Sequence, residues 1–163
     1  MQRLLTTMVL ATLFLAACDT NHQLRPLADD AVILAFGDSL TFGTGAPKDT
    51  SYPNVLANLA GLTVINKGIA GEQTAQGLAR LPVVLAQTKP NLMILCHSGN
   101  DVLRRKSKDQ ARQNLEAMID LIQASGAQVL LLGVPDFGFF LRRRFYQSSG
   151  RKYSSGLCTG SIA

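Results

Sequence analysis

The stretch that decides the fold is Ala31-Val-Ile-Leu-Ala-Phe-Gly-Asp-Ser-Leu40. Its first six residues form an uninterrupted apolar run, which is typical of a strand buried on both faces, as in a parallel sheet. Gly37 ends the run, and Ser39 follows at the expected strand-to-helix turn. Ligands of parallel α/β sheets bind beyond the carboxyl ends of the strands, so this turn is the first candidate for chemistry.

Apolar runs of the same kind recur three times after residue 40. The further predicted strands cover residues 62–66, 91–97 and 128–134. Helices are predicted between them at residues 52–60, 74–87 and 108–124, with Pro82 interrupting the second after residue 81. Strands that alternate with helices favour parallel pairing through right-handed crossovers. The sequence therefore predicts an α/β fold over residues 31–141, a doubly wound parallel sheet with helices on both faces.

Terminal signals mark two of the predicted helices. Ser51 can cap helix 52–60, whose first turn tolerates a proline. Ser107 and Gln110 have the spacing of a capping box at the start of helix 108–124. One apolar stripe follows in that helix, formed by Ala111, Leu115, Met118, Ile119 and Ile122. These signals place helix starts at residues 52 and 108.

Charge is distributed unevenly along the 163 residues, which carry a formal net charge of +5. Residues 1–141 hold 11 basic and 11 acidic residues, so the excess lies in residues 142–163, which contain no acid. The predicted domain therefore has no basic face, and nucleic acid is not an expected partner. Residues 142–163 are either a basic tail without regular structure or the product of a chain that left its reading frame near residue 141.

Loops with chemically useful residues follow three of the strands. They read Gly37-Asp-Ser-Leu40, Gly68-Ile-Ala-Gly-Glu72 and Ser98-Gly-Asn-Asp101. A Ser hydroxyl at such a turn can attack a carbonyl carbon. A Gly lets a backbone N–H approach the carbonyl oxygen, and an Asn amide can supply a further donor. This set of residue types meets the requirements of acyl transfer.

The three blocks and their order resemble the GDSL, or SGNH, hydrolase family, in its branch of thioesterase I, lysophospholipase and arylesterase proteins. The resemblance covers residues 32–140 and is most specific over Gly71-Glu-Gln-Thr-Ala-Gln-Gly-Leu-Ala-Arg-Leu-Pro82. It implies that Ser39 is the nucleophile. It also implies an oxyanion hole formed by the Ser39 and Gly71 amides and the Asn100 side chain, a small acyl ester or thioester substrate, and no cofactor.

The chain departs from the family pattern in two places. Ser98 stands where the Gly-x-Asn-Asp block begins with Gly, a small change that should be tolerated. The family's Asp-x-x-His block, which supplies the general base, has no counterpart, since the only histidines are His22 and His97 and no acid follows Asp136. His97 is either a substitute base or a structural residue at a strand end. We therefore expect a domain without its last strand and helix, and weak hydrolysis, because a Ser without a base is a poor nucleophile.

The N-terminus has the pattern of a targeting segment. Residues 4–17 are apolar, and this run of 14 is shorter than a membrane span, which needs about 20 residues. It ends in Leu15-Ala-Ala-Cys18, which resembles the lipobox of bacterial lipoproteins. The prediction is a signal peptide over residues 1–17 and a lipidated Cys18 with a tether to residue 30. The protein would be anchored to a membrane on the periplasmic side. An ordinary signal peptide and a soluble periplasmic protein are the alternative.

Three further residues have structural interpretations. Asp38 should bond to loop amides and stiffen its turn, and Asp101 should either act in the same way or pair with the basic cluster at residues 104–106. Cys96, inside a strand, should be a free buried thiol. No cysteine spacing typical of zinc sites is present, so no metal is expected.

Three functions fit these observations. The first is an ester or thioester hydrolase that acts through a Ser39 acyl-enzyme. The second is the same fold without turnover, a truncated lipoprotein that at most binds acyl ligands. The third is a cofactor-binding module in which residues 39–45 hold a phosphate, as in a flavodoxin loop. The third leaves Gly71 and Asn100 unexplained.

Overall fold

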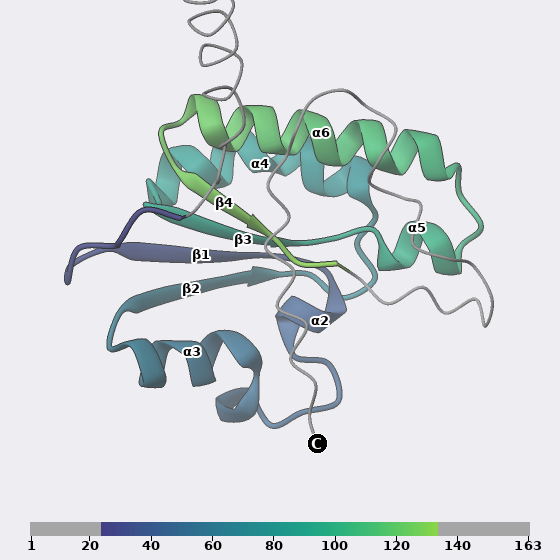
Figure 1. The fold of residues 1–163 in the computed structure, drawn as a ribbon. Helices are drawn as coiled ribbons and strands as arrows, with labels where there is room; N and C mark the ends of the chain where they lie inside the picture. The colour runs from purple at the N-terminus through teal and green to yellow at the C-terminus, as the bar shows by residue number, and fades with distance from the viewer. Residues whose placement is uncertain (1–23, 134–163) are drawn as a thin grey trace, which may run out of the picture.

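The computed structural model describes residues 24–133 (Figure 1). Four strands form one sheet in the order β2-β1-β3-β4, and all three pairings are parallel. The strands are β1 (Val32–Gly37), β2 (Thr63–Gly68), β3 (Leu92–Cys96) and β4 (Gln128–Leu131). The predicted parallel α/β sheet is confirmed, with strand ends shifted by at most three residues. The predicted absence of a last strand and helix concerns residues after 133, which lie outside the described residues.

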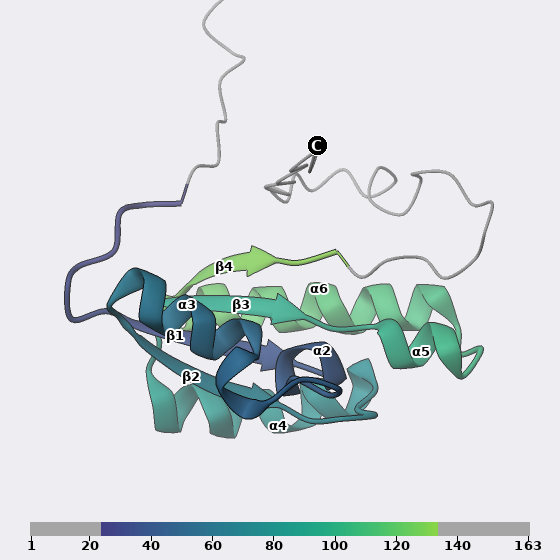
Figure 2. The same cartoon turned by 90° about the horizontal axis from the view of Figure 1, so that it is seen from below.

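Helices cover both faces of the sheet, as predicted. They are α2 (Ser39–Phe42), α3 (Tyr52–Ala60), α4 (Thr74–Thr88), α5 (Gly99–Leu103) and α6 (Lys108–Ala124), with a short 3-10 helix at Lys48–Thr50. Helices α4 and α6 lie side by side on one face, and α3 lies on the other (Figures 1 and 2). The short helices α2 and α5 both start at the carboxyl end of a strand, where the candidate site residues lie.

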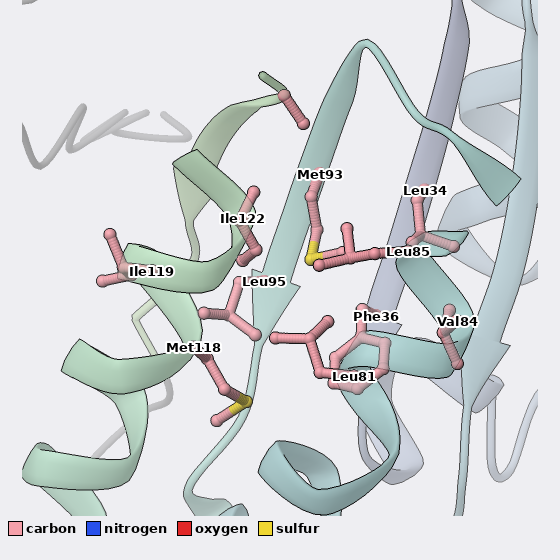
Figure 3. Close-up of a cluster of buried hydrophobic side chains, with 11 residues drawn as sticks. Leu34, Phe36, Leu81, Val84, Leu85, Met93, Leu95, Met118, Ile119 and Ile122 are labelled. Carbon is pink, nitrogen blue, oxygen red and sulfur yellow. The ribbon is translucent and has the colours of Figure 1, made fainter. Parts of the chain in front are cut away.

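Alternating residues of β1 point into two separate apolar cores. Leu34 and Phe36, both fully buried, face α4 and α6, whereas Ile33 faces α3. The core under α4 and α6 is the larger one (Figure 3); its buried members are Leu34, Phe36, Leu81, Val84, Leu85, Met93, Leu95, Met118, Ile119, Ile122 and Ala127. Because β1 and β3 are buried on both faces, their sequences are continuously apolar rather than alternating.

Helix α4 runs from Thr74 to Thr88 without a break, so the predicted interruption at Pro82 is wrong. Proline has no N–H to donate to the carbonyl four residues earlier, which normally ends or kinks a helix. Pro82 is exposed, while Leu81 and Leu85 on the opposite side are buried in the core. Burial of this apolar face keeps the helix on the sheet across the missing hydrogen bond.

The two predicted helix caps differ in outcome. The Ser107 Oγ accepts from the Gln110 N–H at 3.3 Å, which confirms the cap of α6. The reciprocal half of that capping box is not formed, because the Gln110 side chain donates to Asn114. Ser51 occupies the cap position of α3, but its hydroxyl donates to the Lys48 carbonyl oxygen at 3.0 Å instead.

Candidate active site

The carboxyl ends of β1, β2 and β3 are in register. Gly37 at the end of β1 is opposite Gly68 of β2 on one side and Cys96 of β3 on the other. The following loops continue this pairing, since the Ile69 N–H donates to the Gly37 carbonyl (3.0 Å) and the Asp38 N–H to the Cys96 carbonyl (3.3 Å). The strand that follows β1 in the chain, β2, lies on one side of it, and the next strand, β3, lies on the other side. The strand order therefore reverses at β1, which makes this edge the topological switch point.

Two glycines allow α2 to pack directly on this edge. A Cβ at Gly37 would lie 2.0 Å from the Cys96 carbonyl oxygen, and one at Gly68 would lie 2.2 Å from the Phe42 nitrogen. Neither contact is possible for another residue without a shift of the backbone. The close packing places Ser39, the first residue of α2 and only partly buried, directly after the end of β1.

Asp38 stabilises the turn that carries Ser39. Its side chain is 2% exposed, and its Oδ1 accepts from the Leu40 N–H at 3.2 Å. Asp38 therefore caps α2, which confirms the structural interpretation of this carboxylate. The cap engages the Leu40 N–H and not the backbone N–H of Ser39. That N–H has no hydrogen-bond acceptor among residues 24–133.

Gly71 lies in a tight turn after β2. The Glu72 N–H donates to the Ile69 carbonyl at 3.2 Å, and Gly71 has a φ of +79° at the third position of that turn. A positive φ at this position is typical of a type II turn and strongly favours glycine. The Gly71 N–H, like that of Ser39, has no acceptor in the described part of the chain.

Asn100 joins the third loop to the second. It lies in the first turn of α5, and its Nδ2 donates to the Glu72 backbone carbonyl at 3.0 Å. An Asn amide nitrogen carries two hydrogens, so one remains for a ligand. The structure thus brings Asn100 against the turn that contains Gly71. The Ile69 N–H of the same turn bonds to Gly37, at the strand end from which Ser39 follows.

His97 is a buried structural residue in this arrangement. Its side chain is 0% exposed, and its Nε2 lies 3.1 Å from the Glu72 Oε2. Its Nδ1 accepts from the Ser98 N–H at 3.2 Å, so both ring nitrogens have partners within the protein. Gly77 of α4 makes room for the ring, since a Cβ there would lie 2.5 Å from Nε2. These contacts favour the structural interpretation of His97 over that of a substitute base.

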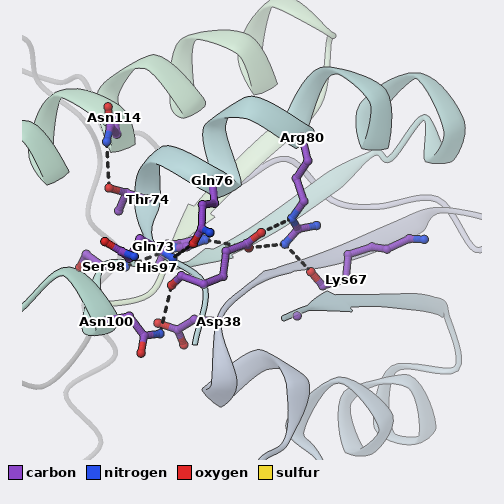
Figure 4. Close-up of polar contacts among 12 residues, drawn as sticks. Asp38, Lys67, Gln73, Thr74, Gln76, Arg80, His97, Ser98, Asn100 and Asn114 are labelled. Carbon is purple, nitrogen blue, oxygen red and sulfur yellow. Dashed lines mark hydrogen bonds and ion pairs between the residues drawn. The ribbon is translucent and has the colours of Figure 1, made fainter. Parts of the chain in front are cut away.

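Sequence reasoning missed an ion pair beneath the turn. Arg80 of α4 donates through Nε and Nη2 to both carboxylate oxygens of Glu72, each at 2.6 Å, and through Nη2 to the Lys67 carbonyl at 2.8 Å (Figure 4). The Arg80 Cζ also lies 3.9 Å from the centre of the Phe36 ring. Glu72 and Arg80 stand in the segment with the strongest family resemblance, but their spacing spans a turn and a helix and gave no sign of a contact.

The Asp101 carboxylate binds the start of α4, so it bonds to an amide as one alternative predicted, and the predicted pairing with the basic cluster at residues 104–106 is wrong. Its carboxylate accepts from the Thr74 N–H at 2.9 Å and from the Thr74 hydroxyl at 2.8 Å. Asn114 of α6 donates to the same hydroxyl at 2.9 Å (Figure 4). Free N–H groups and the positive end of the helix dipole make this helix start a better partner than exposed lysines and arginines.

Cys96 is a free thiol at the end of β3 and is 4% exposed, as predicted. Burial raises the pKa of this thiol to about 11, and the nearby Asp38 carboxylate adds to the shift. A thiol in this state is protonated at neutral pH and is a poor nucleophile. Cys96 therefore contributes packing and no chemistry to the edge.

The loop after β1 uses its own amides. The Gly43 and Thr44 N–H groups both donate to the Ser39 carbonyl at 3.0 Å, and the Phe42 N–H donates to the Asp38 carbonyl at 2.9 Å. A phosphate-binding loop needs such N–H groups for the ligand, so the flavodoxin-like hypothesis loses its support. Within residues 24–133, no three or more acidic, His or Cys side chains are grouped as metal ligands, and no helix has the length and apolar character of a membrane span.

Residues 35–155 match the GDSL-like lipase/acylhydrolase family. Because this match covers most of the chain, the protein belongs to that family of hydrolases. The matched range passes residue 141, and the domain boundary drawn there stays a prediction.

Individual relatives agree with this assignment. Esterase TesA of Pseudomonas aeruginosa is 33% identical over 151 residues, which are 88% of this chain and 73% of the relative. An arylesterase of Vibrio mimicus is 37% identical over 122 residues, 70% of this chain and 61% of the relative. The crystal structure of AlinE4, an SGNH-hydrolase family esterase, superimposes on this protein with a TM-score of 0.61 and a sequence identity of 40%. The superposition covers 67% of this chain and 61% of AlinE4. The matches therefore span between 61% and 73% of the length of these relatives.

Proposed function

We propose that this domain hydrolyses small carboxylic esters or thioesters through an acyl-enzyme on Ser39. The observation that carries the proposal is a set of unused donors at one edge of the sheet. The Ser39 and Gly71 N–H groups lack acceptors among residues 24–133, and Asn100 has one amide hydrogen left. Donors that are fixed before the substrate arrives are the main requirement for stabilising an oxyanion. The relatives named esterase and arylesterase support an ester as substrate.

The reaction would begin with attack of the Ser39 Oγ on the carbonyl carbon. The carbonyl oxygen then becomes negatively charged, and the three donors would stabilise it. The bond to the leaving alcohol or thiol breaks, and the acyl group stays on Ser39 until water removes it. Of these steps, the donors assist the formation and the collapse of the tetrahedral intermediate.

Proton transfer is the step for which residues 24–133 offer no free imidazole. Attack by Ser39 releases a proton, which an imidazole normally accepts. The 163 residues contain two histidines; His22 precedes the domain, and both ring nitrogens of His97 are engaged. A polypeptide of these residues is therefore proposed to turn over substrate at close to the background rate. A non-catalytic lipoprotein that binds acyl ligands is the second candidate, and the same shortage of a base favours it.

Chemical rescue separates the two candidates. The full chain, purified in detergent, is incubated with p-nitrophenyl butyrate with and without free imidazole, which can accept the Ser39 proton. Intact-mass spectrometry should show a butyryl adduct that forms faster in imidazole and that maps to Ser39. Loss of one oxyanion donor in Asn100→Ala should slow its formation by about 10²-fold.

Ser39→Ala is the matched control, because imidazole also hydrolyses such esters in free solution. Equal acylation of the alanine variant would refute the nucleophile, and no adduct under any condition would favour the non-catalytic candidate. Rapid turnover without imidazole, blocked by a fluorophosphonate, would show that a base is present after all.

We also propose that the protein is exported and anchored through a lipid on Cys18. The support is the apolar run that ends in Leu15-Ala-Ala-Cys18, which lies outside the described residues. Stable anchoring takes more than one acyl chain, as bacterial lipoproteins carry. Cys18→Ala should move the protein from the membrane fraction to the soluble fraction in a bacterial host and abolish labelling by radioactive palmitate. Unchanged fractionation would indicate an ordinary signal peptide.

A further inference from the structure

We infer that Glu72 is a positioning residue that fixes the direction of the Asn100 amide, and that Arg80 and His97 serve it by holding its side chain. The inference rests on the proposed function, in which Asn100 is an oxyanion donor. It assigns a role to three buried or half-buried ionisable groups that take no part in the acyl transfer itself.

The Glu72 side chain is held from two sides in the interior. It is 5% exposed, and Arg80 binds both of its oxygens at 2.6 Å, while the His97 Nε2 lies 3.1 Å from Oε2. A buried carboxylate is costly unless it is paired and hydrogen-bonded, and truncating one partner is strongly destabilising. The carboxylate therefore has one available position, set by a helix on one side and a strand end on the other.

The backbone of the same residue carries the contact to Asn100. The Glu72 carbonyl oxygen accepts from the Asn100 Nδ2 at 3.0 Å, and the Glu72 N–H closes the turn around Gly71 at 3.2 Å. A fixed Glu72 side chain limits rotation of the peptide groups on both sides of its Cα. The position of the carboxylate is thereby transmitted to the Asn100 amide.

The neighbouring contacts leave this segment little freedom. Thr74, two residues further on, is held by the Asp101 carboxylate at 2.9 and 2.8 Å. Asn100 and Asp101, which are consecutive in α5, thus bind Glu72 and Thr74. Arg80 of α4 holds the Glu72 side chain as well. His97 fits its place because Gly77 carries no side chain, with the Phe36 ring at a centroid distance of 6.1 Å. These constraints are those expected of a preorganised donor.

A double-mutant cycle tests the inference with the full chain in detergent. The measured quantity is the rate of Ser39 acylation by p-nitrophenyl butyrate in imidazole, at saturating and at low ester concentration. Glu72→Gln should lower the limiting rate by about tenfold, a coupling typical of residues in contact, with little change in the half-saturating ester concentration. In the Asn100→Ala background, Glu72→Gln should cause no further loss, because the amide that Glu72 positions is gone.

Each outcome of the cycle has one meaning. Full multiplication of the two losses, or an unchanged rate in Glu72→Gln alone, would overturn the inference and leave the proposed function standing. An unchanged rate in Asn100→Ala would reject Asn100 as an oxyanion donor and the inference with it, whereas a missing Ser39 adduct in the parent chain would reject the proposed function.

Two additional variants guard against a trivial loss of structure. Glu116→Gln removes the same charge from an ion pair with Arg112 on the surface of α6 (3.0 Å) and should leave acylation unchanged. If Glu72→Gln does not fold, Arg80→Lys replaces it in the cycle, since a lysine cannot bind both carboxylate oxygens in the same plane. The Asn100 side-chain amide resonances of the folded variant should then move, and unmoved resonances would contradict the inference.

Discussion

The body of the sheet and its carboxyl edge are held together by different forces. In the body, Leu34, Phe36 and Leu95 are fully buried between strands and helices, and burial of apolar area has no directional requirement. At the edge, Asp101 bonds to Thr74 across 27 positions and Asn114 bonds to Thr74 across 40. Hydrogen bonds weaken quickly with distance and angle, so the edge depends on geometry that the body has to supply. Stability is therefore concentrated in the body of the sheet, and accurate placement of polar groups at its edge.

The largest expected effect tests the body. Leu81→Ala removes a fully buried side chain from the core under α4 and α6 and should cost about 2–5 kcal/mol of unfolding free energy. Urea denaturation followed by circular dichroism measures the loss. Leu59→Ala, at a side chain that is 82% exposed, is the matched control and should change stability by less than about 0.5 kcal/mol. Equal losses in the two variants would contradict the claim that burial in this core supplies the stability of the body.

An intermediate effect tests the edge by adding volume. Alanine normally favours a helix over glycine by about 1 kcal/mol. Gly77→Ala should nevertheless destabilise the protein by about 1–3 kcal/mol, because the new Cβ would meet the His97 Nε2 at 2.5 Å. The same substitution in a His97→Ala background should cost much less. Thermal melts of the parent chain, the two single variants and the double variant compare them, and a Gly77→Ala single variant more stable than the parent would show that the edge yields easily.

A third effect concerns titration at the edge and is confined to high pH. Burial raises the pKa of Cys96 from 9.0 to about 11 and that of Tyr52 from 10.0 to about 12. Above pH 9 the unfolded chain loses these protons first, so the folded state binds more protons and stability falls as the pH rises. The stabilisation is complete below pH 9 and is lost as the pH passes the folded values. Urea midpoints measured from pH 7 to 12 should fall in this window, and Cys96→Ala should flatten the fall between pH 9 and 11. A midpoint that is independent of pH would contradict the burial of both groups.

Much of the fold could be predicted because it depends on local patterns. The apolar run before Gly37 and the apolar stripe of residues 108–124 report burial, and the two helices at 52–60 and 108–124 begin and end where predicted. The predicted interruption at Pro82 was wrong because it considered only the local effect of proline. Its local effect on a helix is unfavourable, but packing of the surrounding turns on the sheet decides the outcome.

In the candidate site too, short motifs could be recognised in the sequence, whereas contacts between distant residues could not. Ser39, Gly71 and Asn100 were nominated from three short blocks, and their roles remain proposals. The predicted pairing of Asp101 with the basic cluster was wrong because nearby basic residues in the sequence were taken as its partners. Its true partner, Thr74, belongs to another helix, and the pairing of Glu72 with His97 spans 25 positions.

Consecutive residues were enough to predict the family, the parallel sheet and the loops that carry the candidate chemistry, because apolar periodicity and short motifs are local patterns. The contacts among polar groups at the edge, and the donors left without an acceptor among residues 24–133, follow from the tertiary structure alone. The physical reason is that strand register and helix placement set these distances, and a shift of one residue would exchange one hydrogen-bond partner for another.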